Sequence, residues 1–157
     1  METEKNNTGY DLIQSDPGVF LEWDEQSGTL TVYGSGTCEL REVCGGLNVI
    51  DSVAVTVCTV TADVFSHDTS TLTAGTVGGD AWSFGASTLT AGSVGGWAWC
   101  HDTSTLTAGS VGGWVQSSGA SAGSVGSVGG WVQSHETSTL TAGSVANRRS
   151  PSAALKF

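Results

Sequence analysis

Apolar side chains recur along this chain at a fixed spacing of 17 residues. Six tandem copies of a 17-residue unit fill residues 53–154, and they start at Val53, Ser70, Ser87, Ser104, Ser121 and Ser138. The eighth position is valine in all six copies, and the third is apolar in five of them. A flexible Gly/Ser linker has no reason to hold valine at one phase, so the pattern predicts an ordered repeat structure.

Within each unit, polar and apolar positions alternate at a period of two, as in Thr71, Leu72, Thr73 and Ala74. Three glycines within residues 75–79 disfavour a helix, at roughly 1 kcal/mol for each interior glycine. Two short strands separated by glycine turns would form one coil, and stacked coils bury apolar faces that no single coil can bury. The sequence therefore predicts an all-β fold, a single-stranded parallel β-solenoid (β-helix) with about 17 residues per coil.

The third, fifth, eighth, twelfth and fourteenth positions of the unit are predicted to face the interior. They hold Leu or Val, Ala, Val, Val or Ala, and Ser or Cys, so we expect a narrow, flattened cross-section. Successive coils should lie about 4.8 Å apart, which is the spacing of neighbouring strands.

The repeat divides the chain into four segments. We expect residues 1–18 to be a flexible N-terminal segment and residues 19–52 to form two degenerate coils that cap the rod. Residues 53–147 should form the regular solenoid and residues 148–157 a C-terminal tail that trails or covers the open edge. Val43 falls on the valine column, and Pro151 should end the pairing because proline lacks a ladder donor.

Charge is spread unevenly over the chain, which has a formal net charge of -10. Ten of the fifteen acids lie in residues 1–52, and no Lys or Arg occurs between Arg41 and Arg148. A surface without cations cannot neutralise phosphates, so we expect binding to neither nucleic acid nor an anionic membrane. The pair Arg148 and Arg149 is expected to belong to a solvated tail.

Targeting signals are not evident in the sequence. No stretch has the 18 or more apolar residues of a membrane helix, and the N-terminus lacks the basic start and apolar run of a secretory signal. Localisation stays open: cytoplasmic by default, or cell surface or secreted if a signal was removed.

Few residues suggest chemistry. The cysteines Cys38, Cys44, Cys58 and Cys100 match no zinc spacing, and we expect free, partly buried thiols, with disulfides as the alternative. His67, His101 and His135 would lie two coils apart, too far to share a metal ion. Adjacent residues of Ser66-His67-Asp68 point to opposite sides of a strand and cannot form a catalytic relay.

Asp63 and Asp80 would stack on adjacent coils, near the separation of a retaining glycosidase pair. Nothing in their surroundings distinguishes an acid from a base. We therefore expect no enzymatic activity, no cofactor and no metal site.

Pairs of the form Thr-x-Thr are the most specific outer feature. Both hydroxyls of such a pair face the same way in a strand, and stacked pairs would form a flat array of methyl and hydroxyl groups. The candidate binding residues are Thr71, Thr73, Thr88, Thr90, Thr105, Thr107, Thr139 and Thr141. The array breaks in the copy at Ser121, and threonine also suits exposed strand positions in general. The pairs resemble the ice-binding face of insect antifreeze β-solenoids, and that resemblance implies ice binding.

Tryptophans form a second outer feature, a candidate aromatic ladder. Trp97, Trp114 and Trp131 occupy the eleventh position of consecutive copies, and Trp82 and Trp99 the thirteenth. Because the twelfth position points inward, these rings should point outward. Such a patch would serve a partner chain, a polysaccharide or another rod; alternatively, the rings lie flat over the Gly-Gly turns.

The repeat length and pattern over residues 53–145 resemble bacterial β-solenoid repeat proteins, including adhesin-like surface repeats and the polymer-forming bactofilins. That resemblance implies self-association through coil ends or binding along a flat face. We therefore expect a non-enzymatic structural or interaction protein whose partner is another copy or another protein, with ice or polysaccharide as alternatives.

Overall fold

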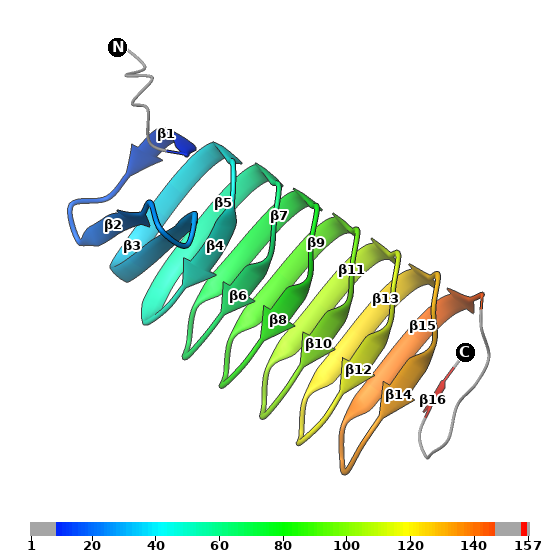
Figure 1. Ribbon diagram of the computed structural model, residues 1–157. Helices are drawn as coiled ribbons and strands as arrows, with labels where there is room; N and C mark the ends of the chain where they lie inside the picture. Colours follow the sequence, from blue (N-terminus) through cyan, green and yellow to red (C-terminus); the bar gives the residue numbers. More distant parts are fainter. Residues whose placement is uncertain (1–8, 147–154, 157) are drawn as a thin grey trace.

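The chain winds into a parallel β-solenoid whose coils stack along one axis (Figure 1). This computed structural model describes residues 9–146 and 155–156. The rod has about seven turns, and each regular strand pairs in parallel with the strand 17 residues later, as Thr71 does with Thr88. The predicted fold class, an all-β solenoid with about 17 residues per coil, is confirmed.

Each regular coil contributes one strand to each of two faces. The longer strands form sheet A, which holds β3 (Thr29–Val43), β5 (Ser52–Val60), β7 (Thr71–Val77), β9 (Thr88–Val94), β11 (Thr105–Val111), β13 (Ala122–Val128) and β15 (Thr139–Val145). The shorter strands form sheet B, which holds β4 (Gly46–Val49), β6 (Val64–Ser66), β8 (Ala81–Ser83), β10 (Ala98–Cys100), β12 (Val115–Ser117) and β14 (Val132–Ser134). Strand β3 belongs to both faces, because its first part pairs with β4 and its second part with β5.

Two antiparallel strands close the N-terminal end of the rod. β1 (Tyr10–Ser15) pairs with the second part of β3, and β2 (Val19–Asp24) pairs with the first part. Asp16, in the loop between them, accepts hydrogen bonds from the backbone N–H and the hydroxyl of Thr37 at 2.8 and 2.9 Å. These bonds lower the pKa of Asp16 from its ordinary value and fasten the loop to the first coil.

This end differs from the expected division of the chain. Residues 10–15, within the segment expected to be flexible, form β1. Residues 19–24 run antiparallel to β3, so one degenerate coil, built from β3 and β4, precedes the regular repeats instead of two. The physical reason is that the first coil presents unpaired backbone groups at its edge, and antiparallel strands can satisfy them. Val43 does pair with Val60 in the valine column.

The interior is a narrow stack of small side chains. Leu72, Ala74, Val77 and Ala81 are buried, as predicted for the third, fifth, eighth and twelfth positions, and so is Ser83 at the fourteenth. Burying one Leu or Val contributes roughly 1.5–3 kcal/mol, so the apolar columns supply most of the driving force for stacking. The serines of the first position are also buried, which the apolar pattern did not indicate; they are Ser70, Ser87, Ser104, Ser121 and Ser138.

At the other end, β16 (Leu155–Lys156) pairs in parallel with Leu140 and Thr141 of β15. Two residues of the expected tail thus cover part of the last sheet A edge. Arg148, Arg149 and Pro151, for which a solvated tail and an end to pairing were expected, lie outside the described residues. The part of the chain that the structure describes holds no helix with the length and hydrophobicity that crossing a membrane would need.

Candidate functional site

Threonines at the second and fourth positions form two columns on the outside of sheet A. The parallel register places Thr88 between Thr71 and Thr105, and it aligns the fourth-position threonines in the same way. Neighbouring columns lie about 6.6 Å apart along a strand, and neighbouring coils about 4.8 Å apart. We call this surface the threonine face. It contains all eight predicted threonines: Thr71, Thr73, Thr88, Thr90, Thr105, Thr107, Thr139 and Thr141.

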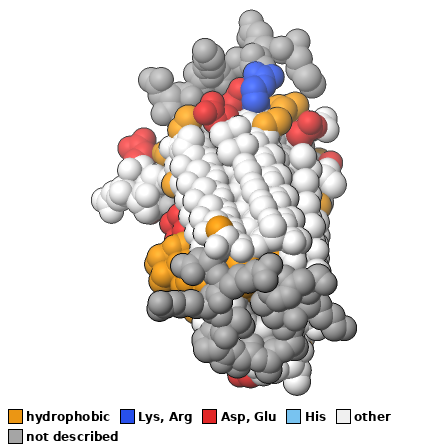
Figure 2. Space-filling view, turned by 90° about the vertical axis from the view of Figure 1, so that its right-hand side faces the viewer, with side chains coloured by type: hydrophobic (Ala, Val, Ile, Leu, Met, Phe, Trp, Pro, Cys, Tyr) orange, Lys and Arg blue, Asp and Glu red, His pale blue; other side chains and the backbone are white. Residues whose placement is uncertain are grey.

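The threonine face is open to solvent and uncharged. Six of its eight threonines are exposed, and the pair on β9, Thr88 and Thr90, is half-buried. Within the described residues, hydroxyl hydrogen bonds lie inside the coils, at their corners and in the N-terminal cap, and none involves these eight. Figure 2 views this side and shows parallel rows of uncharged side chains, with acidic and basic groups at the margins. The hydroxyls are therefore available to water or to a ligand.

The face continues through the irregular copy that starts at Ser121. Ala122 pairs with Thr105, and Ser124 pairs with Thr107, so this coil keeps one hydroxyl and loses the other. On the N-terminal side, Thr56 pairs with Thr73 and extends the fourth-position column by one coil. The sequence analysis did not include Thr56, because its copy lacks the Thr-x-Thr pattern. Thr56 could have been found from its place at the fourth position of the copy that starts at Val53.

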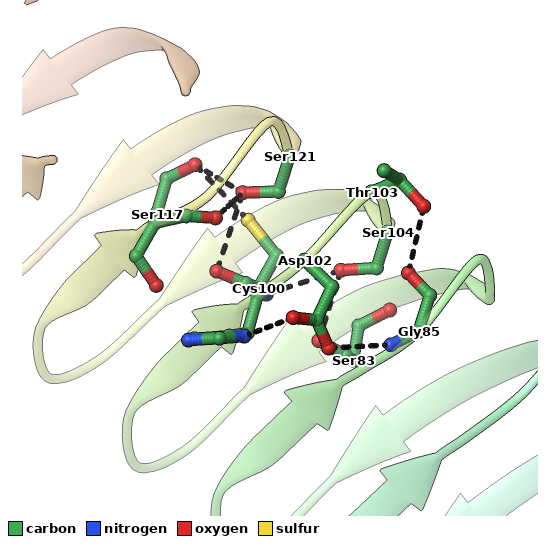
Figure 3. Close-up of polar contacts among 10 residues, drawn as sticks. Ser83, Gly85, Cys100, Asp102, Thr103, Ser104, Ser117 and Ser121 are labelled. Carbon is green, nitrogen blue, oxygen red and sulfur yellow. Dashed lines mark hydrogen bonds and ion pairs between the residues drawn. The ribbon is translucent and has the colours of Figure 1, made fainter. Parts of the chain in front are cut away.

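Serine hydroxyls inside the coils contrast with those outside, because they are hydrogen-bonded. Ser66 Oγ and Ser70 Oγ lie 2.8 Å apart, and Ser70 Oγ donates to the carbonyl of Val49 in the preceding coil at 3.2 Å. The pair Ser117 and Ser121 repeats this arrangement (Figure 3). These residues occupy the fourteenth and first positions, where the chain turns from sheet B to sheet A. Their bonds close that corner and tie it to the preceding coil.

Within the aromatic ladder, the tryptophans of the eleventh position stack on one another along the rod. The ring centroids of Trp97 and Trp114 lie 4.7 Å apart with planes 1° from parallel, and Trp131 follows at 4.5 Å. Parallel rings this close overlap face to face, so Trp114 meets solvent mainly through its edge and is 40% exposed. A Cβ on Gly113 would collide with the Trp97 ring. The rings thus point outward and also cover the glycine turns.

Rings on sheet B make a second stacked group. Trp82 lies 4.7 Å from Trp99 and 6.1 Å from Phe65, measured between ring centroids. Phe84 lies 5.0 Å from His67, with nearly parallel planes. Phe65 and Phe84 were not among the predicted residues. Their places in the repeat, the thirteenth and the fifteenth position, could have indicated that they lie on this face. The contacts join neighbouring coils and supply packing energy to the stack.

The recurring His-Asp-Thr motif builds a corner of the coil. Its acid has left-handed backbone in each case: Asp68 (φ 59°), Asp102 (φ 62°) and Glu136 (φ 60°). Glycine takes the same corner in the coils between, as Gly85 does with φ 66°. The Asp102 carboxylate accepts the N–H of Gly85 at 3.2 Å, and the Thr103 hydroxyl donates to the Gly85 carbonyl at 3.1 Å (Figure 3). Because acid and glycine alternate at this corner, most of the acids have a glycine, not another acid, at the same position of the neighbouring coil. The alternation therefore limits repulsion between like charges.

Asp63 and Asp80 hold the main chain of the following coil. Asp63 Oδ1 accepts the backbone N–H of Asp80 at 2.8 Å, and Asp80 Oδ1 accepts that of Trp97 at 2.7 Å. Each carboxylate therefore satisfies a turn amide one coil further on. This arrangement gives both acids a structural role at the turns of the coil.

The cysteines are free thiols, as expected; Cys38 and Cys100 are buried, and Cys44 and Cys58 are exposed. Burial raises the pKa of Cys38 to about 11 and also raises the pKa of Cys100.

His101 Nδ1 lies 2.8 Å from Asp102 Oδ1 at an exposed corner. Within residues 9–146, no three His, Cys, Asp or Glu side chains are grouped closely enough to hold a metal ion.

Comparisons with family models, curated proteins and solved structures find no significant match. The functional argument therefore starts from the surfaces themselves. Of the two candidate surfaces, the threonine face offers hydroxyls that have no partner among the described residues. In the aromatic ladder, Trp114 has a neighbouring ring on both sides, although Trp97 and Trp114 remain exposed.

Proposed function

We propose that this protein is a non-enzymatic interaction rod that binds a flat, uncharged and regularly spaced surface through its threonine face. The observation that carries the proposal is the in-register stacking of outward threonines whose hydroxyls have no hydrogen-bond partner within the described residues. Such an array presents donors, acceptors and methyl groups at fixed spacings. A partner with the same periodicity can contact every coil at once.

The rigidity of the array supports this role. Each strand of sheet A pairs with a coil on either side, so the backbone cannot adjust one threonine independently of the next. Threonine is also stiff at χ1 because it is β-branched. Little conformational entropy remains to be lost on binding, which favours a preorganised surface.

The absence of charged residues from the sheet A strands β7, β9, β11 and β13 also supports it. Charged side chains of sheet A are found near the cap, where Arg41 forms a 3.0 Å ion pair with Asp11. Covering the threonine face would therefore desolvate hydroxyls but no ions, and a hydroxyl that finds a partner regains most of its hydration.

Ice is the second candidate ligand, favoured by the two-dimensional regularity of the face. Spacings of about 4.8 Å across coils and about 6.6 Å along strands form a rectangular lattice of hydroxyls and methyls. Ordered water could occupy such a lattice, in keeping with the resemblance to insect antifreeze β-solenoids. The irregular coil removes one hydroxyl at Ala122 and keeps the other at Ser124.

Thermal hysteresis in dilute solution tests the ice candidate. The double variant Thr90→Leu/Thr107→Leu should abolish hysteresis, because it replaces two central hydroxyls and raises bulk above the flat face. Gln116→Leu on sheet B is the matched control and should leave hysteresis unchanged. Absence of hysteresis in the wild type would exclude ice and leave a macromolecular partner.

Self-association is tested separately, by gel filtration with light scattering. The cap strands β1 and β2 cover the N-terminal coil edge, so we expect association to occur laterally through the threonine face rather than end to end. The Thr90→Leu/Thr107→Leu variant should then run as a smaller species than the wild type. A wild type that stays monomeric over a wide concentration range would rule out a second copy as the partner.

A further inference from the structure

The outward column at the eleventh position of the repeat changes character partway along the rod. In consecutive coils it holds Asp63, Asp80, Trp97, Trp114 and Trp131. Short carboxylate side chains are thus followed by large indole rings, and the change falls between the coil of β8 and the coil of β10 (Figure 1). We call the place where Asp80 meets Trp97 the acid-aromatic step.

One face of the Trp97 ring is open at the acid-aromatic step. Its other face is covered by Trp114, with ring centroids 4.7 Å apart and planes 1° from parallel. A Cβ on Gly113 would collide with the ring, so Trp97 leans over the following coil. Because the Asp80 side chain is shorter than an indole, the outer part of the ring rises above it. Trp97 is accordingly 47% exposed, against 40% for Trp114, which has a ring on both sides.

The carboxylates beside this ring have spare hydrogen-bonding capacity and no counter-ion. Asp80 Oδ1 accepts the backbone N–H of Trp97 at 2.7 Å, which fixes the carboxylate at the foot of the ring. Asp63 likewise uses Oδ1 for its hydrogen bond, and the second oxygen of each acid has no partner among the described residues. Neither acid forms an ion pair within residues 9–146. No Lys or Arg occurs in residues 42–147 that could supply one.

A negative charge beside an open indole face favours a cationic ligand. The face of an aromatic ring is the negative part of its quadrupole, and tryptophan attracts cations most strongly among the aromatic side chains. A neutral ligand would leave the charge of Asp80 uncompensated, and an anion would be repelled by it. The chemistry of the acid-aromatic step therefore selects a positively charged group.

The shape of the acid-aromatic step favours a guanidinium over an ammonium group. A guanidinium is planar, so it can lie flat on the Trp97 ring while an N–H at its edge donates to Asp80 Oδ2. An ammonium group is compact and strongly hydrated, and it cannot stack. Only the planar cation uses the ring face and the carboxylate together.

We propose that the acid-aromatic step binds an arginine side chain of a partner polypeptide, with the guanidinium stacked on Trp97 and hydrogen-bonded to Asp80. The surrounding charge suits a basic segment, because the chain has a formal net charge of -10. Exposed acids also lie at the sixteenth position, beyond the other end of the sheet B strands, at Asp68, Asp102 and Glu136. These charges attract a basic partner from a distance. The acid-aromatic step and the threonine face are separate surfaces, so this proposal and the function proposed above succeed or fail independently.

Isothermal titration of the full chain with acetylated tetraarginine amide tests the proposal. Trp97→Leu and Asp80→Asn should each weaken binding about threefold to tenfold. The asparagine keeps an oxygen for the Trp97 N–H, so it removes the charge and leaves the turn in place. Asp102→Asn, the matched control, removes the same charge from the far corner of the coil and should stay within about twofold of the wild type. The tetracitrulline peptide, which is neutral and of nearly the same shape, should not bind.

The double variant Asp80→Asn/Trp97→Leu distinguishes one shared guanidinium from general attraction between charges. When both side chains hold the same group, the combined loss of affinity is smaller than the product of the two single losses. Acetylated tetralysine amide carries the same charge as the arginine peptide but cannot stack, so it should bind the wild type more weakly.

Four results would overturn the proposal. They are no binding of tetraarginine to the wild type, a loss in Asp80→Asn no greater than in Asp102→Asn, a double-variant loss equal to the product of the single losses, and equal affinity for tetralysine and tetraarginine. Circular dichroism checks that each variant keeps the solenoid, and Asp80→Asn against Asp102→Asn keeps the test decisive if Trp97→Leu does not fold. The Thr90→Leu/Thr107→Leu variant should bind tetraarginine as the wild type does, which separates this site from the threonine face.

Discussion

The hydroxyl oxygens of Ser83 and Ser87 lie 2.9 Å apart inside the solenoid, at the corner where β8 gives way to β9. Ser87 also donates to the carbonyl of Ser66, one coil earlier, at 3.0 Å. The same corner recurs in every regular coil but one, where Cys100 replaces the serine and its Sγ contacts Ser117 Oγ at 3.4 Å. Buried serines are thus the polar counterpart of the valine column.

Substitutions at this corner should change the free energy of unfolding in opposite directions. Ser83→Ala removes one buried hydrogen bond and should destabilise the protein by about 1 kcal/mol. Cys100→Ser should restore the hydroxyl pair with Ser104 and stabilise it by up to about 1 kcal/mol. Urea denaturation measures both. A clear loss of stability in Cys100→Ser would show that the thiol packs better here than a hydroxyl.

Trp114 lies between two rings, so its removal should weaken the coil stack. Trp114→Ala loses two aromatic contacts, each worth about 0.5–1.5 kcal/mol beyond the buried area, and we expect a loss of about 1–3 kcal/mol in unfolding free energy. Near-ultraviolet circular dichroism should lose the signal of the coupled indoles. Gln133→Ala, on the same side of a nearby coil, is the control and should change stability by less than about 0.5 kcal/mol. An unchanged transition in Trp114→Ala would mean that the ladder is not structural.

Asp102 should tolerate glycine better than alanine, because its backbone is left-handed with φ 62°. Asp102→Ala places a Cβ in that conformation without a carboxylate to bond Gly85, and we expect it to cost about 1–2 kcal/mol. Asp102→Gly removes the strain and should remain within about 1 kcal/mol of the wild type. Thermal unfolding of the two variants side by side decides the point. Equal stabilities of Asp102→Ala and Asp102→Gly would contradict the prediction that the left-handed backbone at this position disfavours alanine.

Gly123 occupies the third position, where four of the other copies carry leucine. A Cβ there would meet Leu140 Cδ1 at 2.5 Å, so the next coil already fills the space. Gly123→Leu should therefore destabilise the protein by about 1–3 kcal/mol, although it restores the repeat. Adding Val125→Ala, which restores the smaller fifth position, should recover part of the loss. Additive effects of the two substitutions would argue against shared packing.

Stability should fall as pH rises through the alkaline range because of Cys38. Its folded pKa, about 11, lies above the ordinary thiol value of 9.0, since the side chain is buried. Between these values the unfolded chain loses the proton and the folded chain keeps it, so unfolding is favoured as pH rises from 9.0 to about 11. The expected contribution is about 2–3 kcal/mol.

The variant Cys38→Val isolates this effect, because Val55 already occupies the same position in the next coil. The difference in unfolding free energy between the two proteins should grow across the window in favour of Cys38→Val. Parallel pH profiles would show that the thiol ionises as readily in the folded state as in the unfolded one.

Much of the fold could be predicted from the sequence alone, because the coils pair in register. A residue that lies above its counterpart in space also lies 17 positions from it in the sequence, as Val60 and Val77 do. The phase of the repeat thus revealed the inward columns and the threonine columns. The same reasoning placed Trp97 and Trp114 on the outside, but it could not orient their rings, since stacking depends on contacts between coils.

What the sequence determined by itself is the coil length, the inward apolar positions and the outward threonines, because these follow from a hydrophobic period repeated along a single axis. The tertiary structure alone decided the features that depend on corners and ends: the buried Ser66–Ser70 type of pair, the left-handed Asp102, and the antiparallel strands β1 and β2. A polar residue at a corner is buried only when its hydrogen-bond partner lies in place. An end is capped only where unpaired backbone groups demand it. Neither condition appears in the pattern of hydrophobic residues.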